Sequence, residues 1–280
     1  MTEHFPREVL YSRMIGIIND SDLEVLGSST VAVPGCGGVG YTHAEALARM
    51  GIGHFKIADF DTFGPENVNR QFGAVVETFG KPKATVLHDR LLSINPAIEV
   101  QVFDGVTEDT VEEFLDGVDF VCDALDYFVI QPRRLMYRRA YEKGIPVVMS
   151  GPIGFGAATH FFVPGGMTFD EFFDLHDGLS EEEMLLNFGA GLNPGRLDRH
   201  YLPDAKLDFV ERKVASVSSS CLLATVQSTS TAVLSLLRRE TAVRPVPWVQ
   251  QMDYVAGKFH QIIVDDGVRS IRADAERYLG

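Results

Sequence analysis

The feature that most constrains the fold is a short apolar run that leads into a glycine-rich turn, Val31-Ala-Val-Pro-Gly-Cys-Gly-Gly-Val-Gly40. The run predicts a buried β-strand, and residues 41–50 after the turn predict a helix. This order places backbone N–H groups at a helix N-terminus, where phosphate binds readily. The pattern G-x-G-x-x-G is formed by Gly35, Gly37 and Gly40, with Gly38 inside it. The feature therefore predicts a nucleotide-binding α/β fold.

Strand and helix patterns alternate along the first 163 residues, which predicts a Rossmann-like, doubly wound, mostly parallel sheet. Further strands are expected at 54–58, 98–103, 118–124 and 145–149, and helices at 83–95, 111–116 and 133–143. We expect one domain over residues 1–280. Its parts are an N-terminal helical arm (1–28), a nucleotide-binding core (29–163), a loop-rich crossover or lid (164–213) and a C-terminal helix and hairpin (214–280).

Charge and cysteine content limit the possible partners. The formal net charge of −14 makes a nucleic-acid partner unlikely, because affinity for a phosphate backbone needs clustered Lys and Arg. The polar N-terminus lacks a signal pattern and no apolar run is long enough to span a bilayer, so we expect a cytoplasmic protein without membrane contact. The three cysteines form no C-x-x-C pair, so no zinc is expected.

Polar residues that follow the second predicted strand are suited to hold a nucleotide. Asp59 lies where a carboxylate normally holds a ribose hydroxyl, and Asp61 follows two residues later. Arg70 is flanked by Asn67, Asn69 and Gln71, a set of donors able to bracket a triphosphate. Lys83 begins a predicted helix, where the helix dipole disfavours a cation. We therefore expect Lys83 to bind an anion. We interpret Lys81 as solvated.

A second group of candidates lies further along the chain. Asp126 follows a predicted parallel strand and is the expected Mg²⁺ ligand, since one carboxylate and phosphate oxygens suffice for that ion. Asp123 is a weaker second candidate, with a strand-end cap as its simpler role. Cys221, near the start of a long predicted helix (216–239), is the best nucleophile candidate, although free cysteines are mostly small buried apolar residues, as we expect for Cys36 and Cys122. We interpret His43 and His160 as structural.

Taken together, these motifs resemble the adenylyltransferases that activate ubiquitin-like and sulfur-carrier proteins, the ThiF/MoeB/HesA group and the ubiquitin-activating enzymes. The resemblance implies binding of ATP and Mg²⁺ and attack of a carboxylate on the α-phosphate, which gives an acyl-adenylate and pyrophosphate. The matching motifs are Gly35-Cys-Gly-Gly-Val-Gly40, Asp59-Phe-Asp61, Asn67-Val-Asn-Arg-Gln71, Gly80-Lys-Pro-Lys83, Ile94-Asn-Pro96 and Cys122-Asp-Ala-Leu-Asp126.

The resemblance also implies roles for single residues. Asp59 would hold the ribose, Asn67, Arg70 and Lys83 would contact phosphates, and Asp126 would hold Mg²⁺. The family supplies an arginine from the N-terminal arm of the partner subunit, which corresponds to Arg13 here and implies a homodimer. Two departures stand out: the C-x-x-C zinc pairs of many members are missing, and Tyr127 replaces the usual Asn.

Other interpretations remain open at this stage. An NAD(P)-dependent Rossmann oxidoreductase would explain the glycines and Asp59 but leaves Arg70, Lys83 and Asp126 without a task. A non-catalytic scaffold that binds a partner is the third hypothesis. Within the adenylation hypothesis, the substrate is expected to be the C-terminus of a ubiquitin-like or sulfur-carrier protein or a peptide, and a small molecule or a modified nucleoside is the alternative.

Overall fold

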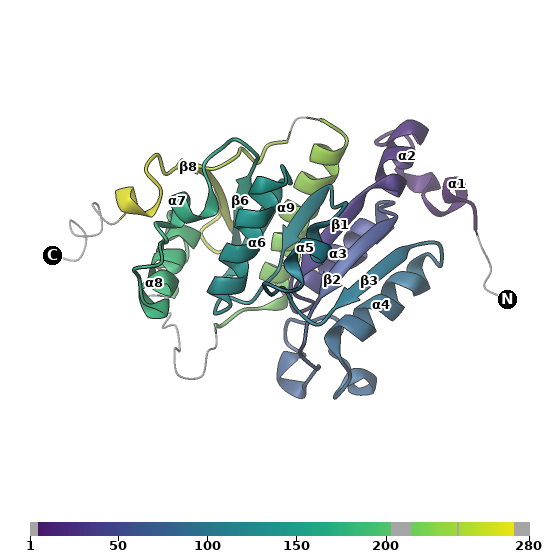
Figure 1. Ribbon diagram of the computed structural model, residues 1–280, viewed down its shortest axis with the longest axis horizontal. Coiled ribbons are helices and arrows are strands. Elements are labelled where there is room, and N and C mark those ends of the chain that lie inside the picture. The colour runs from purple at the N-terminus through teal and green to yellow at the C-terminus, as the bar shows by residue number, and fades with distance from the viewer. Residues whose placement is uncertain (1–4, 203–213, 240, 272–280) are drawn as a thin grey trace.

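A computed structural model describes residues 5–202, 214–239 and 241–271. Its centre is an eight-stranded sheet in the order β3-β2-β1-β4-β5-β6-β7-β8, with helices on both faces (Figure 1). The strands are β1 (Thr30–Pro34), β2 (His54–Ala58), β3 (Glu99–Phe103), β4 (Phe120–Asp123), β5 (Val147–Ile153), β6 (Gly156–Phe162), β7 (Trp248–Asp253) and β8 (Lys258–Ile263). The α-helices are α1 (Arg7–Leu10), α2 (Asp20–Ser28), α3 (Gly40–Arg49), α4 (Lys83–Ile94), α5 (Val111–Leu115), α6 (Ile130–Glu142), α7 (Phe169–Phe173), α8 (Glu181–Leu192) and α9 (Ser218–Leu236).

The first five strands are parallel and confirm the doubly wound arrangement. β1 pairs with β2 on one side and with β4 on the other, so the order of the strands reverses between β1 and β4. In open α/β sheets, ligands bind beyond the carboxyl ends of the strands at such a switch point. The segments that follow β1, β2 and β4 therefore meet at the expected binding edge.

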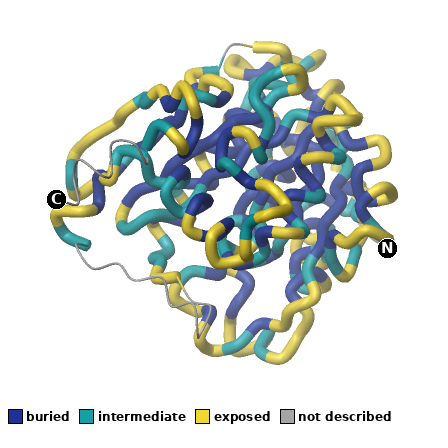
Figure 2. The backbone as a smooth tube through the Cα atoms, turned by 60° about the vertical axis from the view of Figure 1, so that its left-hand side comes forward, coloured by how far each residue is buried: buried dark blue, intermediate teal, exposed yellow. Residues whose placement is uncertain are grey.

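Each face of the sheet has its own hydrophobic core. On one face α3, α4 and α9 cover the sheet, and Leu47, Phe55 and Leu87 are fully buried between them. On the other face α5, α6, α7 and α8 enclose a second core. Figure 2 shows the buried backbone as a band through the middle of the molecule with exposed segments around it. Because both faces are covered, the central parallel strands β1 and β4 are buried along almost their whole length, whereas the edge strand β3 stays partly exposed.

The sheet continues beyond β5 with three antiparallel strands. β5 and β6 form a hairpin in which Ile153 pairs with Gly156, and β7 and β8 form the hairpin expected from the sequence. The apolar run His160-Phe-Phe-Val163 predicts a strand that starts at His160, whereas β6 begins earlier, at Gly156. The difference arises because Gly156, Ala157 and Ala158 have little strand propensity of their own and are held in the sheet by pairing with β5 and β7.

Residues 164–202, the described part of the expected crossover or lid, are more regular than their sequence pattern predicts. They contain α7 and α8, and each begins with a capping box, at Thr168 and at Ser180. Phe169, Phe172 and Phe173 of α7 are buried in the second core. The expected loop character thus applies to less of this segment; residues 203–213 lie outside the described residues.

The N-terminal arm is helical as expected and is attached to the core by side chains. Arg7 donates to the carbonyl oxygens of Leu23 (2.9 Å) and Gly51 (2.6 Å), and Tyr11 Oη donates to Ala48 O at 3.0 Å. Arg13 lies in the 3₁₀ helix Ser12–Met14 of this arm. Within the ranges given above, no helix is both long and apolar enough to cross a bilayer.

Candidate functional site

The glycine-rich turn between β1 and α3 requires residues without a Cβ at two positions, Gly35 and Gly40. Gly35 has a φ of +92°, and a Cβ at this position would clash with the carbonyl oxygen of Ala124. A Cβ on Gly40, the first residue of α3, would clash with the carbonyl oxygen of Gly35. The turn is therefore tight and lies directly against the segment that follows β4. The turn leads directly into the N-terminus of α3, and the first N–H groups of a helix are the donors that a phosphate site requires.

Asp59 is fixed beside this turn. Its carboxylate accepts hydrogen bonds from Cys36 N at 2.6 Å and from Asp61 N at 2.8 Å. Burial raises the pKa of Asp59, and the two backbone donors and Lys83 oppose that shift. The carboxylate is thus held at the end of β2, next to the glycine-rich turn, where the sequence predicts a ribose ligand.

Lys83 begins α4 as predicted, and Asp61 is the anion that it contacts. Lys83 Nζ lies 2.9 Å from Asp61 Oδ2, and the backbone N–H of Lys83 donates to Asp61 O at 2.9 Å. The lysine side chain is buried, whereas that of Asp61 is about half exposed. The sequence predicts an anion next to Lys83, and in the structure the carboxylate of Asp61 is that anion. The ammonium group retains two further donors for a phosphate.

The loop after β2 places Arg70 and Gln71 against the glycine turn. An atom at the Cβ position of Gly37 would lie 3.5 Å from Gln71 Nε2, and one on Gly38 would lie 3.7 Å from Arg70 Cγ. Arg70 Nη1 donates to Asn69 Oδ1 at 3.0 Å. Gln71 Oε1 is buried and has no hydrogen-bond partner among the described residues. A buried unpaired oxygen is costly, so it indicates a ligand or water at this position.

Asn67 has a structural part in the same loop. Its Oδ1 accepts a hydrogen bond from Gly64 N at 3.0 Å, and its side chain is almost wholly buried. The expectation that Asn67 brackets a phosphate is therefore limited to its amide NH₂, because the carbonyl end holds the loop.

The two candidate metal ligands, Asp123 and Asp126, differ in burial and in their hydrogen-bond partners. Asp123 is 1% exposed and forms an ion pair with Arg133 at 2.8 Å, so its role is structural. Asp126 is exposed; its Oδ1 accepts from Phe128 N at 3.0 Å, and no hydrogen bond to its Oδ2 is found in the described ranges. His, Cys, Asp and Glu side chains form no cluster of three in the part of the chain that the structure describes. A single free carboxylate fits Mg²⁺ only when phosphate oxygens complete the ligand set.

The structure does not support a nucleophilic role for the cysteines. Cys221 Sγ would lie 3.2 Å from a Cβ on Gly38, so the thiol packs beneath the turn. Cys221 is 1% exposed, and burial raises the pKa of its thiol to about 11. A helix N-terminus can lower a thiol pKa, but for Cys221 the desolvation caused by burial is larger, and the nearby charge of Arg70 opposes it only in part. Burial also raises the pKa of Cys36 and of Cys122.

Arg13, the remaining expected site residue, is exposed. It forms no ion pair within residues 5–202, 214–239 and 241–271. Its expected action on a neighbouring subunit stays a prediction.

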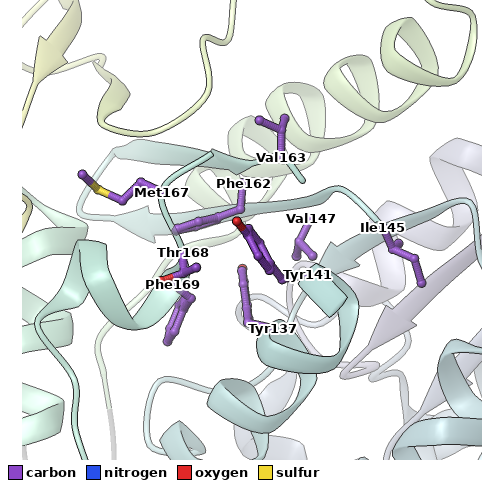
Figure 3. A pocket seen from close by; sticks show the side chains of 9 residues that line it. All are labelled: Tyr137, Tyr141, Ile145, Val147, Phe162, Val163, Met167, Thr168 and Phe169. Atoms are coloured by element: carbon purple, nitrogen blue, oxygen red, sulfur yellow. The ribbon is translucent and has the colours of Figure 1, made fainter. Parts of the chain in front are cut away.

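A small pocket lies at the end of the sheet opposite the glycine-rich turn. Tyr137, Tyr141, Val147, Phe162 and Phe169 are among the residues that line it (Figure 3). Because Val147 begins β5, the pocket lies at the amino ends of the parallel strands, opposite the switch point. Its volume of about 10 Å³ is at the lower limit for one water molecule, so it is no nucleotide site.

The fold and the residues at its switch point define a nucleotide-binding α/β protein of the doubly wound class. More specifically, the chain belongs to the ThiF family, whose model matches residues 11–262. The resemblance inferred from the motifs is thereby confirmed.

The curated relatives match part of the chain. It is 40% identical over 142 residues to the tRNA threonylcarbamoyladenosine dehydratase of Bacillus subtilis (strain 168), a match that covers 50% of this chain and 55% of that protein. It is 32% identical over 139 residues to the sulfur carrier protein adenylyltransferase of Thermus thermophilus, covering 49% of this chain and 48% of the relative. The chain thus spans about half the length of the curated relatives it matches.

Solved structures share the fold over most of the chain. PaaA superposes with a TM-score of 0.68 at 19% identity and covers 94% of this chain and 77% of that one. MccB in complex with N-formylated MccA superposes with a TM-score of 0.63 at 18% identity, covering 88% of this chain and 67% of MccB. At these identities the comparison establishes the fold alone.

Proposed function

We propose that the chain is an ATP-dependent adenylyltransferase that activates a carboxylate as an acyl-adenylate. One observation supports this most directly: three candidate groups lie around the glycine-rich turn. Asp59 accepts a hydrogen bond from Cys36 N, and Arg70 lies beside Gly38. The segment that leads to Asp126 packs against Gly35. Lys83 joins the same group through Asp61. A cofactor-storing dinucleotide site would use the turn and Asp59 but has no need of two cations and a free carboxylate beside the phosphates.

The residues divide the task in the following way. Asp59 would hold the ribose hydroxyls, and the turn, Arg70 and Lys83 would bind the phosphates. Asp126 would hold Mg²⁺, which neutralises phosphate charge when bound. An oxygen of the substrate carboxylate forms a bond to the α-phosphorus, and the bond from that phosphorus to the bridging oxygen of the β-phosphate breaks. The products are the acyl-adenylate and pyrophosphate, so the work of the site is to position the groups and stabilise negative charge.

The proposed substrate is the C-terminus of a ubiquitin-like or sulfur-carrier protein or of a peptide. The relatives named sulfur carrier protein adenylyltransferase and molybdopterin-synthase adenylyltransferase support this class. A second candidate, a carboxylate on a modified tRNA nucleoside, is favoured by the 40% identity to the dehydratase of Bacillus subtilis. The net charge of −14 weighs against the tRNA. The segment 164–213 is proposed to select between such substrates.

The proposal includes a homodimer in which Arg13 reaches the phosphates of the neighbouring subunit. The exposure of Arg13 on an arm attached to the core by Arg7 and Tyr11 supports this arrangement. A cytoplasmic location is part of the same proposal.

The test is a calorimetric titration with ATP and Mg²⁺ and, separately, with NAD, followed by isotope exchange between pyrophosphate and ATP. A sulfur-carrier protein ending in Gly-Gly, a short peptide and threonylcarbamoylated tRNA serve as the three carboxylate probes. We expect ATP binding, and exchange that Arg70→Ala and Asp126→Ala abolish while both variants keep the native circular dichroism spectrum. Binding of NAD in preference to ATP, or full exchange in either variant, would contradict the proposal.

A further inference from the structure

Two consecutive arginines of α6 are both buried, yet they serve different parts of the molecule. Arg133 is 2% exposed and Arg134 is 4% exposed. Arg134 forms ion pairs with Asp170 of α7 at 2.8 Å and with Asp177 at 3.2 Å. Arg133 faces the end of β4 instead. A buried guanidinium group is costly unless its donors are satisfied, so the partners of each arginine show what it holds.

Arg133 holds the backbone of the segment that ends in Asp126. Its Nε donates to Asp123 Oδ2 at 2.8 Å, its Nη1 donates to Asp126 O at 3.1 Å, and its Nη2 donates to Leu125 O. One rigid planar group thus binds a carboxylate at the end of β4 and two successive carbonyls beyond it. A lysine could not make these three contacts at once, since it lacks the planar fork.

The neighbours of Arg133 restrict it further. Asp123 also accepts from Tyr137 Oη at 3.0 Å and from Leu125 N at 3.0 Å. The ring of Phe188 in α8 lies 4.8 Å from the guanidinium carbon of Arg133. The four side chains of this network, those of Asp123, Arg133, Tyr137 and Phe188, are buried, whereas Asp126 is exposed. The position of Asp126 is therefore set through its backbone from beneath.

The same segment lies against the phosphate turn. A Cβ on Gly35 would clash with the carbonyl oxygen of Ala124, which leaves no space between the two. A shift of the backbone at Leu125 would move Asp126 relative to the turn. Loss of the Arg133 hydrogen bonds would therefore change the distance between Asp126, the candidate metal ligand, and the bound phosphates.

We propose that Arg133 is a positioning residue for Asp126 and thereby sets the affinity of the site for the Mg²⁺ that accompanies the nucleotide. This inference rests on the proposed function. Residues that orient a metal ligand typically change metal affinity 10- to 100-fold when they are altered. Substitution of Arg133 therefore raises the Mg²⁺ concentration needed for ATP binding without removing any group that touches the nucleotide.

Arg133→Lys is the test variant and Arg134→Lys is its matched control. Both remove the fork of a buried arginine from the same helix, one residue apart, so both lower the thermal midpoint of unfolding. ATP binding is titrated calorimetrically at a series of Mg²⁺ concentrations. We expect Arg133→Lys to need about tenfold more Mg²⁺ than the wild type for half-maximal affinity, and Arg134→Lys to need the same as the wild type.

The outcomes separate this inference from the proposed function. The inference alone is overturned if the wild type binds ATP in a Mg²⁺-dependent way and Arg133→Lys needs no more Mg²⁺ than the wild type. It is also overturned if Arg134→Lys raises the Mg²⁺ requirement as much as Arg133→Lys does. A wild type that does not bind ATP overturns the proposed function and the inference with it. Should Arg133→Lys fail to fold, Tyr137→Phe deletes only the hydroxyl that bonds to Asp123, and we expect a smaller shift in the same direction. An unchanged Mg²⁺ requirement in Tyr137→Phe would then contradict the inference.

Discussion

The ammonium group of Lys83 lies 2.9 Å from the carboxylate of Asp61, with the lysine buried and the aspartate open to solvent. The pair joins the start of α4 to the residues that follow β2. In the proposed function, this buried cation lies close to the glycine-rich turn and stabilises charge that develops on the nucleotide.

Substitution Lys83→Ala removes that cation. We expect the rate of pyrophosphate–ATP exchange to fall about 10²- to 10³-fold, as is usual for loss of one preorganised stabilising group. Lys81→Ala is the control, because Lys81 is exposed in the same motif and its loss should leave the rate unchanged. Equal rates in the two variants would show that Lys83 serves only the structure.

Cys221 should be inert toward alkylation and dispensable for adenylation. With a thiol pKa of about 11, only about one molecule in a thousand carries the thiolate at pH 8, and the sulfur is buried as well. We expect Cys221→Ala to keep the exchange rate of the wild type, and mass spectrometry after iodoacetamide treatment to find Cys221 unmodified in the folded protein. A covalent substrate adduct on Cys221 would refute this expectation.

His43 should make the protein less stable in acid. Burial lowers its pKa to about 3, while the unfolded chain has the ordinary value near 6.5. The unfolded state therefore binds the proton first, and the free energy of unfolding falls as the pH drops from about 6.5 toward 3. Each such histidine contributes about 1.4 kcal/mol per pH unit to that slope. His160, whose pKa burial lowers to about 4, contributes in the same direction.

We expect the free energy of unfolding of His43→Leu to depend less steeply on pH than that of the wild type, by the contribution of one proton. Urea denaturation at several pH values between about 4 and 6 measures this slope. An unchanged slope in His43→Leu would contradict the assignment.

Phe173 anchors α7 in the second core. Its side chain is fully buried and packs on Phe169, Phe172 and Phe188. Phe173→Ala should lower the free energy of unfolding by about 3–5 kcal/mol. The exposed Phe155, changed to Ala, should alter it by no more than about 0.5 kcal/mol. Denaturant titration of both variants measures the difference.

The parallel half of the fold could be predicted from sequence because its signals are local. Glycine at a turn, a carboxylate at a strand end and an apolar run all act within a few residues of one another. The predicted second strand agrees with β2 (His54–Ala58) and the helix that begins with Lys83 is α4. The hairpin at the C-terminal end was also identified, because β7 and β8 are separated by a short turn containing Gly257.

What could not be predicted depends on contacts between distant residues. The small residues at the start of β6 are extended only because strands on both sides pair with them. α7 is five residues long, too short to show a helical period. Asp123 and Arg133 are ten residues apart, and nothing in the sequence indicates that they meet. The raised pKa of Cys221 likewise follows from burial by the turn, which no local pattern reports.

The two adjacent arginines of α6 also fix the rotation of that helix about its own axis. Neighbouring positions on a helix differ by about 100° in direction, so inserting or deleting one residue ahead of Arg133 would turn both guanidinium groups away from their carboxylates at once. Natural variation in chain length is therefore expected in the turns before and after α6, and not between Ile130 and Arg134.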